Sequence, residues 1–203
     1  MKPFILVIDM QGDFVQSASP VAVRHISGHL GKFKNFIDKA RIAGIPIGYT
    51  RHCFDPKSNP VEAQLFPALS RGNTLQKGTP GWNIVSELAP SAGDLVIDKT
   101  RYDAFFNTNL HTTLRSRSID TLIITGTMTE VCCESTARSA MYLDYKVQFC
   151  SDLTFSNDQA RHESTIRVIA SHFGQVKTSA ELGGVFAQPA ARETSLRSRW
   201  VGM

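Results

Sequence analysis

The stretch Phe4-Ile5-Leu6-Val7-Ile8-Asp9 decides the fold class of this chain. Five apolar residues follow one another without alternation and end at a carboxylate, a pattern typical of a β-strand that is buried on both faces. Such strands occur almost only in parallel sheets that helices cover on both sides. The run therefore predicts the first strand of an α/β protein.

Helical and strand-like patterns alternate after this run. Between residues 21 and 43 apolar side chains recur at steps of three and four, and Gly44 follows as a stop signal. Further strand-like runs lie at 45–50, 95–98, 121–125, 146–150 and 175–178, and further helical patterns at 131–143 and 158–173. A loop-rich stretch with four prolines fills residues 51–81. This order predicts three layers, α/β/α, around a six-stranded parallel sheet.

Length and composition fit one globular domain. The chain has 203 residues, of which 42% are hydrophobic and 20% charged, and no linker-like composition interrupts its middle. We expect a single domain over residues 1–203 with a basic tail at 189–203. A solvated tail is favoured over an arm that docks Trp200 on a neighbouring subunit.

Charge and hydropathy exclude several classes of protein. The net charge is +4, but Lys and Arg form no runs, so nucleic-acid binding is not expected. No apolar run approaches the roughly 18 residues of a membrane span, and Phe4–Ile8 is too short for a signal-peptide core, which predicts a cytoplasmic protein without membrane contact. The four cysteines are expected to be reduced thiols, because they have neither CxxC spacing nor a secretory context.

Three reactive side chains lie past the ends of strand-like runs. Asp9 and Lys99 directly follow such runs, and Cys132 ends the segment 126–132 that joins the run at 121–125 to its helix, so all three are expected at the edge of a parallel sheet where ligands bind. A thiol on the first turn of a helix near an ammonium has a lowered pKa, and a carboxylate can take its proton. The backbone N–H groups of Met128 and Cys132 are expected to bind an oxyanion.

Each of these residues also has an ordinary interpretation. An Asp at a strand end is often a cap, a Lys is usually solvated, and a lone Cys is more often a packed helix residue. Adjacent Cys133 competes for the role of nucleophile, but neighbouring helix side chains point about 100° apart, so only one of the two faces the site. The joint position of the three groups favours catalysis.

Three segments resemble the signatures of the isochorismatase-like cysteine hydrolase superfamily. They are LVIDMQGDF at 6–14, DKTRYDAFF at 98–106 and GTMTEVCCESTAR at 126–138. The resemblance implies a Rossmann-like sheet, a triad of Asp9, Lys99 and Cys132, and a cis peptide bond between Thr127 and Met128. It also implies hydrolysis of a small amide or of an N-carbamoyl or ureido compound through a thioester, by a protein that forms homo-oligomers.

Differences between this sequence and similar proteins narrow the expected activity. Cys132 favours amide cleavage, because in similar isochorismatases another residue occupies this position. Similar nicotinamidases hold a metal through an Asp-x-His set and a later His, whereas this chain has His52-Cys53-Phe54 and no histidine near Thr74, so neither a metal nor another cofactor is expected. Nicotinamidase or isochorismatase activity proper, and a non-catalytic binding or thiol redox-sensing protein, remain the alternatives.

Two questions concern the surroundings of the triad. Candidate pocket residues are Phe14, Arg51, His52, Trp82 and Phe105, although the aromatic ones are more often core and the roles of Arg51 and His52 stay open. The strand order 3-2-1-4-5-6, which the resemblance implies, leaves Lys99 two strands from Asp9, roughly 10 Å at sheet spacing. A long side chain or a bent loop must close this gap.

Overall fold

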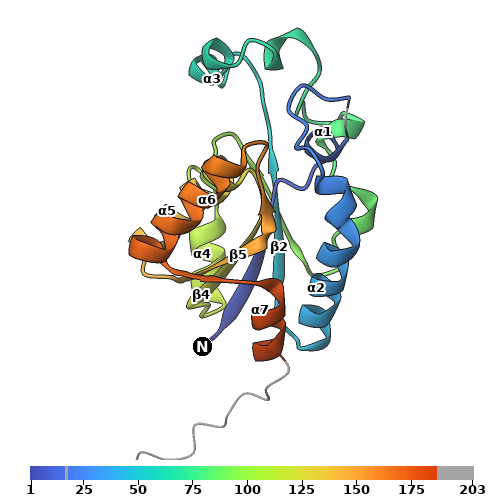
Figure 1. Cartoon of the computed structure of the whole chain (residues 1–203). Helices are drawn as coiled ribbons and strands as arrows, with labels where there is room; N and C mark the ends of the chain where they lie inside the picture. The colour runs from blue at the N-terminus through green and yellow to red at the C-terminus, as the bar shows by residue number, and fades with distance from the viewer. Residues whose placement is uncertain (17, 187–203) are drawn as a thin grey trace, which may run out of the picture.

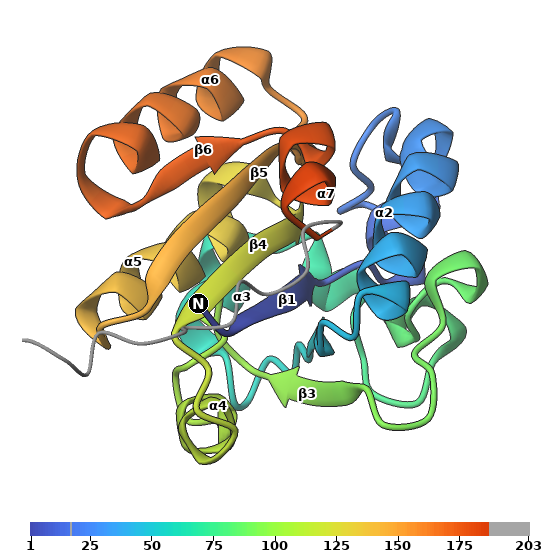
Figure 2. The ribbon, with the colours of Figure 1, turned by 90° about the horizontal axis from the view of Figure 1, so that it is seen from below.

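The computed structural model describes residues 1–16 and 18–186, and they form a parallel sheet between two layers of helices (Figures 1 and 2). The strands are β1 (Pro3–Ile8), β2 (Ile47–His52), β3 (Leu95–Lys99), β4 (Thr121–Thr127), β5 (Lys146–Phe155) and β6 (Gln175–Lys177). Their spatial order is β3-β2-β1-β4-β5-β6, and every neighbouring pair is parallel. The predicted α/β class and six-stranded parallel sheet are confirmed.

Helices cover both faces of this sheet. Figure 2 shows α2 (Leu30–Ile42) and α7 (Ser179–Phe186) on one face, and α4 (Leu110–Ser116), α5 (Glu134–Tyr142) and α6 (Gln159–Val168) on the other. The short helices α1 (Gly12–Val15) and α3 (Pro60–Leu65) lie in connections. Each helical layer packs a separate apolar core against the sheet, so β1 is buried on both faces, as its sequence predicts.

Several element boundaries differ from the predicted ones. The helical pattern at 21–43 forms α2 from Leu30, after a 3-10 turn at Ile26–His29, and His25 before that turn has a left-handed backbone with a φ of 65°. The predicted stop at Gly44 is confirmed by its φ of 71°. The strand predicted at 146–150 continues as β5 to Phe155, because β4 and β5 pair again beyond an irregularity at Ile124–Gly126.

The ends of β1 and β4 touch at a position that requires glycine. Gly126 pairs with Ile8 and has a φ of 115°, and a Cβ on Gly126 would collide with the backbone of Ile8. The two strands therefore approach closely just before the residues that follow them, Asp9 and the turn that carries Cys132.

Two further predictions from the sequence concern membrane contact and the basic tail. Within the described residues, no helix is both long and apolar enough to cross a membrane. The basic tail at 189–203, with Trp200, lies outside the described residues.

Candidate active site

Asp9 follows β1 directly and is fully buried. Its backbone has a φ of 52°, which turns the chain sharply where the strand ends. The hydroxyl of Thr50 on β2 donates to Oδ1 of Asp9 over 2.6 Å, and the Asp9 N–H donates back to that hydroxyl over 3.2 Å. The neighbouring strand thus holds the carboxylate in one orientation.

Lys99 ends β3, and its side chain closes the gap of two strands. Nζ lies 2.6 Å from Oδ2 of Asp9 and 3.5 Å from Sγ of Cys132, and it donates to the backbone oxygen of Arg101 over 3.1 Å. An ammonium has three hydrogens, so each has a partner. The carboxylate, the ammonium and the thiol named from the sequence therefore meet at one point.

Cys132 lies on a π-helical turn, Thr129–Cys133, between β4 and α5. Its side chain is buried and contacts Lys99, whereas Sγ of Cys133 lies 4.0 Å from the backbone oxygen of Thr125 on β4. Of the adjacent pair, only Cys132 faces the carboxylate and the ammonium. Single π-turns of this kind occur often at functional sites.

The surroundings of Cys132 favour the neutral thiol over the thiolate. Burial raises the pKa of Cys132, the Lys99 ammonium lowers it, and the Asp9 carboxylate, which also accepts a hydrogen bond from the thiol, raises it. The net direction is upward, so the expectation of a lowered pKa is wrong for the free site. Burial also acts to lower the pKa of Lys99, but Asp9 and Cys132 outweigh it and the pKa is raised.

These directions follow from charge balance. Asp9 and Lys99 compensate each other inside the protein, and a thiolate beside them would leave one negative charge buried without a partner. The proton on Cys132 therefore lies next to a carboxylate that can accept it when a substrate arrives.

Backbone donors surround the turn that carries Cys132. The peptide bond between Thr127 and Met128 is cis. The N–H groups of Val131 and Cys133 both donate to the backbone oxygen of Met128, over 3.2 and 3.1 Å, so they are occupied. The N–H groups of Met128 and Cys132 stay the predicted oxyanion donors.

A second buried polar cluster adjoins the triad. Nε2 of His52, at the end of β2, lies 3.0 Å from Oε1 of Glu62 on α3, and the His52 ring stacks on Tyr102. The side-chain amide of Asn59 donates to Oε2 of Glu62 over 2.9 Å. His52 thus binds Glu62 through its ring, while its backbone is held by the side chain of Gln11.

The charges of this cluster reach the triad. Burial acts to raise the pKa of Glu62, but hydrogen bonds and charge from His52, and charge from Lys99, outweigh it and the pKa is lowered. Burial raises the pKa of Tyr102 to about 12, helped by the charge of Glu62. Glu62 and Tyr102 were not among the predicted pocket residues, although Asn59-Pro60-Val61-Glu62 is a helix-start pattern within the loop-rich stretch.

The structure places the other predicted pocket residues elsewhere around the site. Phe14 packs into the core beneath α2, and Phe105 stacks on Tyr145 in the opposite core. The guanidinium of Arg51 pairs with Asp98 and lies 3.8 Å from the centre of the Trp82 ring. Their roles in substrate binding stay predictions.

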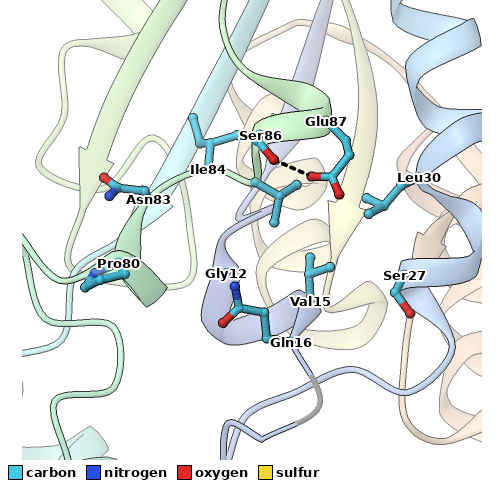
Figure 3. A pocket seen from close by; sticks show the side chains of 11 residues that line it. Gly12, Val15, Gln16, Ser27, Leu30, Pro80, Asn83, Ile84, Ser86 and Glu87 are labelled. Carbon is cyan, nitrogen blue, oxygen red and sulfur yellow. Dashed lines mark hydrogen bonds between the residues drawn. The ribbon is translucent and has the colours of Figure 1, made fainter.

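Two hollows lie near this edge of the sheet. One, of about 230 Å³, lies between α3 and the segment after β3, and Glu62 and Tyr102 line it. A larger one, of about 530 Å³, is bounded by α1, the start of α2 and residues 80–87, and the triad does not line it (Figure 3). The triad does not line the smaller hollow either, but two residues that do, Glu62 and Tyr102, interact electrostatically with Lys99.

The donor set of the site suits proton transfer and nucleophilic attack. Within residues 1–16 and 18–186, no three His, Cys, Asp or Glu side chains are grouped so that they could hold a metal ion.

The sequence and fold match known proteins over almost the whole described chain. A family model described as the isochorismatase domain matches residues 3–181. The ureidoacrylate amidohydrolase RutB of Agrobacterium fabrum is 32% identical over 207 residues, which cover 92% of this chain and 90% of that protein.

Solved structures agree with this match. A cysteine hydrolase from Pseudomonas syringae pv. phaseolicola has a TM-score of 0.85 at 30% identity, over 91% of this chain and 92% of that one. The N-carbamoylsarcosine amidase of Thermoplasma acidophilum has a TM-score of 0.77 at 28% identity, over 88% of this chain and 97% of that one.

Proposed function

The chain belongs to the isochorismatase family, and we propose that it is a cysteine hydrolase that cleaves a C–N bond of a small amide, N-carbamoyl or ureido compound through a thioester. The contact of Lys99 Nζ with both Asp9 and Cys132, inside a buried site, is the observation that carries this proposal. The names of two similar proteins, a ureidoacrylate amidohydrolase and an N-carbamoylsarcosine amidase, support the substrate class.

In the first half of the reaction, Asp9 accepts the proton of the Cys132 thiol as Sγ attacks the carbonyl carbon. The carbonyl oxygen becomes an oxyanion, which the N–H groups of Met128 and Cys132 bind. When the C–N bond breaks, the protonated Asp9 gives that proton to the leaving nitrogen, and an ammonia or amine departs. Cys132 is left bound to the acyl or carbamoyl group.

In the second half, water replaces the amine. Asp9 takes a proton from the water as its oxygen attacks the thioester carbon, and the C–S bond breaks. The proton on Asp9 then returns to the sulfur, which restores the thiol. Lys99 keeps its contacts with both groups, so the carboxylate stays charged and correctly oriented between the two halves.

Glu62 supports a substrate rich in N–H groups. The half-buried carboxylate of Glu62, which interacts electrostatically with Lys99, can accept hydrogen bonds from a carbamoyl NH₂, a group that offers two donors. His52 and Asn59 hold Glu62 in place. The redox-sensing alternative gains no support, because oxidant sensors are exposed thiols of low pKa, whereas Cys132 is buried and its pKa is raised.

Two properties of the protein belong to the same proposal. We expect it to work in the cytoplasm, because its four cysteines form no disulfide, as is usual in reducing compartments. We also expect a homo-oligomer, as the resemblance implies, with a small molecule as its substrate.

The adjacent cysteines provide the test. Cys132→Ala should lower ammonia release from a panel of amides, ureido compounds and N-carbamoyl amino acids on the order of 10⁴-fold or more. Cys133→Ala, the matched control, should stay within several-fold of the wild type, because its sulfur faces β4. Mass spectrometry of the quenched reaction should place the adduct on Cys132. An adduct on Cys133, or full activity without Cys132, refutes the assignment.

A further inference from the structure

The turn that carries Cys132 is attached to α6 through side chains. Thr129, which begins this turn, is fully buried, and its Oγ1 lies 2.9 Å from Nδ1 of His162 on α6. The next residue, Glu130, accepts a hydrogen bond over 2.9 Å from the hydroxyl of Ser156, in the segment that precedes α6. The conformation of the turn is therefore held by a neighbouring element as well as by its own backbone bonds.

The contact between His162 and Thr129 lies next to the groups that are expected to react. Met128, whose N–H is a predicted oxyanion donor, directly precedes Thr129, and Cys132 follows three residues later. The backbone oxygen of Met128 also accepts hydrogen bonds from two N–H groups of the turn. Because Thr129 connects the donor to the sulfur along the chain, a displacement of Thr129 would change the position of one relative to the other.

The His162 ring is suited to this contact in its neutral form. Burial lowers the pKa of His162, although the carboxylates of Glu130 and Glu163 act to raise it. A neutral imidazole has one donor and one acceptor nitrogen, and a threonine hydroxyl can donate or accept. The bond to Thr129 therefore forms with either tautomer of the ring, and it needs no charge.

α6 is itself held in place on both sides of His162. Asp158 caps its first turn by accepting a hydrogen bond from the N–H of Arg161 over 3.1 Å. Thr165 lies three residues after His162, on the same face of the helix, and donates to Oε2 of Glu134 over 2.8 Å. The ring of His162 thus projects from a fixed helix toward the turn.

We propose that His162 is a positioning residue: it holds Thr129 so that the N–H of Met128 and the sulfur of Cys132 stay directed at the same carbonyl group. This inference rests on the proposed function, because that carbonyl group belongs to the substrate of the proposed reaction. The oxyanion develops only as the sulfur attacks, so a loosened turn weakens binding of the transition state more than binding of the substrate. Loss of the bond should therefore lower kcat and leave KM nearly unchanged.

Substitutions of different reach test the bond. The amide nitrogen and oxygen of asparagine lie as far from the backbone as Nδ1 of histidine, whereas those of glutamine lie one carbon farther. His162→Asn should therefore keep kcat within about threefold of the wild type, whereas His162→Gln and His162→Leu should lower it about 10- to 100-fold, because small misplacements of reacting groups are costly. In all three variants KM should change less than about threefold. Ammonia release from the best substrate of the panel measures both constants.

The other partner of the bond provides an independent variant. Thr129→Val removes the hydroxyl at nearly constant shape and should lower kcat as much as His162→Leu does. Combining the two substitutions should cost little more than either alone, because both remove the same interaction. Fully additive losses would show that the two side chains act separately, which overturns the proposal.

Two controls separate this bond from the general docking of α6. Nδ1 of His172 also lies 2.6 Å from a hydroxyl, that of Ser171, but this pair is exposed and follows α6, so His172→Leu should leave kcat and KM unchanged. Thr165→Val removes the bond to Glu134 from the same face of α6. A loss of kcat in Thr165→Val equal to that in His162→Leu would assign the effect to the helix as a whole and overturn the role of His162. Thermal unfolding identifies the variants that remain folded.

Iodoacetamide labelling examines the turn without a substrate. Release of the turn exposes a buried thiol, so in a Cys133→Ala background Cys132 should be labelled several-fold faster in His162→Leu and Thr129→Val than in His162→Asn. If the wild type hydrolyses no compound of the panel, the proposed function fails, and equal labelling rates in these variants then overturn the role of His162 as well. If the wild type is active but His162→Leu and Thr129→Val keep its kcat, the role of His162 is overturned and the proposed function stands.

Discussion

Asp9→Asn separates two effects that Asp9 has on Cys132. The carboxylate accepts the thiol proton in the proposed reaction, and its negative charge also raises the pKa of that thiol. Asparagine has nearly the same shape but neither charge nor basicity. In the variant Lys99 lacks its acidic partner, so a Cys132 thiolate would balance the ammonium charge. The thiol should ionise more easily while turnover falls.

The distances to Nζ of Lys99 set the size of the shift. Oδ2 of Asp9 and Sγ of Cys132 both contact this nitrogen, at 2.6 and 3.5 Å, so the two atoms lie at most about 6 Å apart. At an effective dielectric constant of about 20, two like charges at that separation repel by roughly 3 kcal/mol, which corresponds to about two pKa units. Loss of the hydrogen bond from the thiol to the carboxylate acts in the same direction.

Iodoacetamide labelling across pH measures this shift. In a Cys133→Ala background, mass spectrometry reads the labelled fraction at Cys132, and the midpoint in Asp9→Asn should lie about two pH units below that of the parent. Cys53 is an internal reference, because burial and the hydrogen bond that Trp82 donates to it affect its pKa more than the surrounding charges do. Turnover should fall about 10²- to 10⁴-fold. An unchanged or higher midpoint, or retained turnover, refutes the reasoning.

Two further substitutions test the polar cluster and the strand contact. Glu62→Gln removes a negative charge beside Tyr102, so the pKa of Tyr102, now about 12, should fall toward its usual value but stay above it, because burial remains. A titration that follows tyrosinate absorbance measures this pKa. An unchanged pKa would show that the charge of Glu62 does not act on Tyr102. Gly126→Ala forces a side chain against Ile8 at a φ of 115° and should cost about 3 kcal/mol of unfolding free energy in urea. Gly31→Ala on α2, with open space around it, should cost nothing, and equal stability of both variants would contradict the close contact.

The sheet followed from periodicity because its strands are short apolar runs between helix-length segments. Where the predicted boundaries of helices and strands were inexact, strand pairing or the local backbone conformation overrode the pattern of apolar residues. Residues 151–155 include Ser151 and Asp152, which end the apolar run, yet β5 continues there because β4 pairs with it. The helices α4 and α7 were missed, since seven or eight residues give too few turns for a clear period.

The active site, like the fold, was only partly predictable from the sequence. Asp9, Lys99 and Cys132 were identifiable because each lies at or beyond the end of a strand, and the sheet brings such positions to one edge. The raised pKa of Cys132 could not be predicted, because it depends on distances and burial that a sequence does not contain. Glu62 was missed because α3 lies in an irregular connection with no buried face, and its partner His52 is ten residues away along the chain.

The position of β1 in the middle of the sheet has a consequence for how the protein is made. β1 leaves the ribosome before both of its partners: it pairs with β2 on one side, but β4, its partner on the other side, ends only at Thr127. Until β4 has been synthesised, one edge of β1 has no partner strand. A partly formed sheet with such an apolar, unpaired edge associates readily with other nascent chains. The central strand is thus also the one that most needs protection during synthesis, and shortening the chain before β4 would leave it permanently exposed.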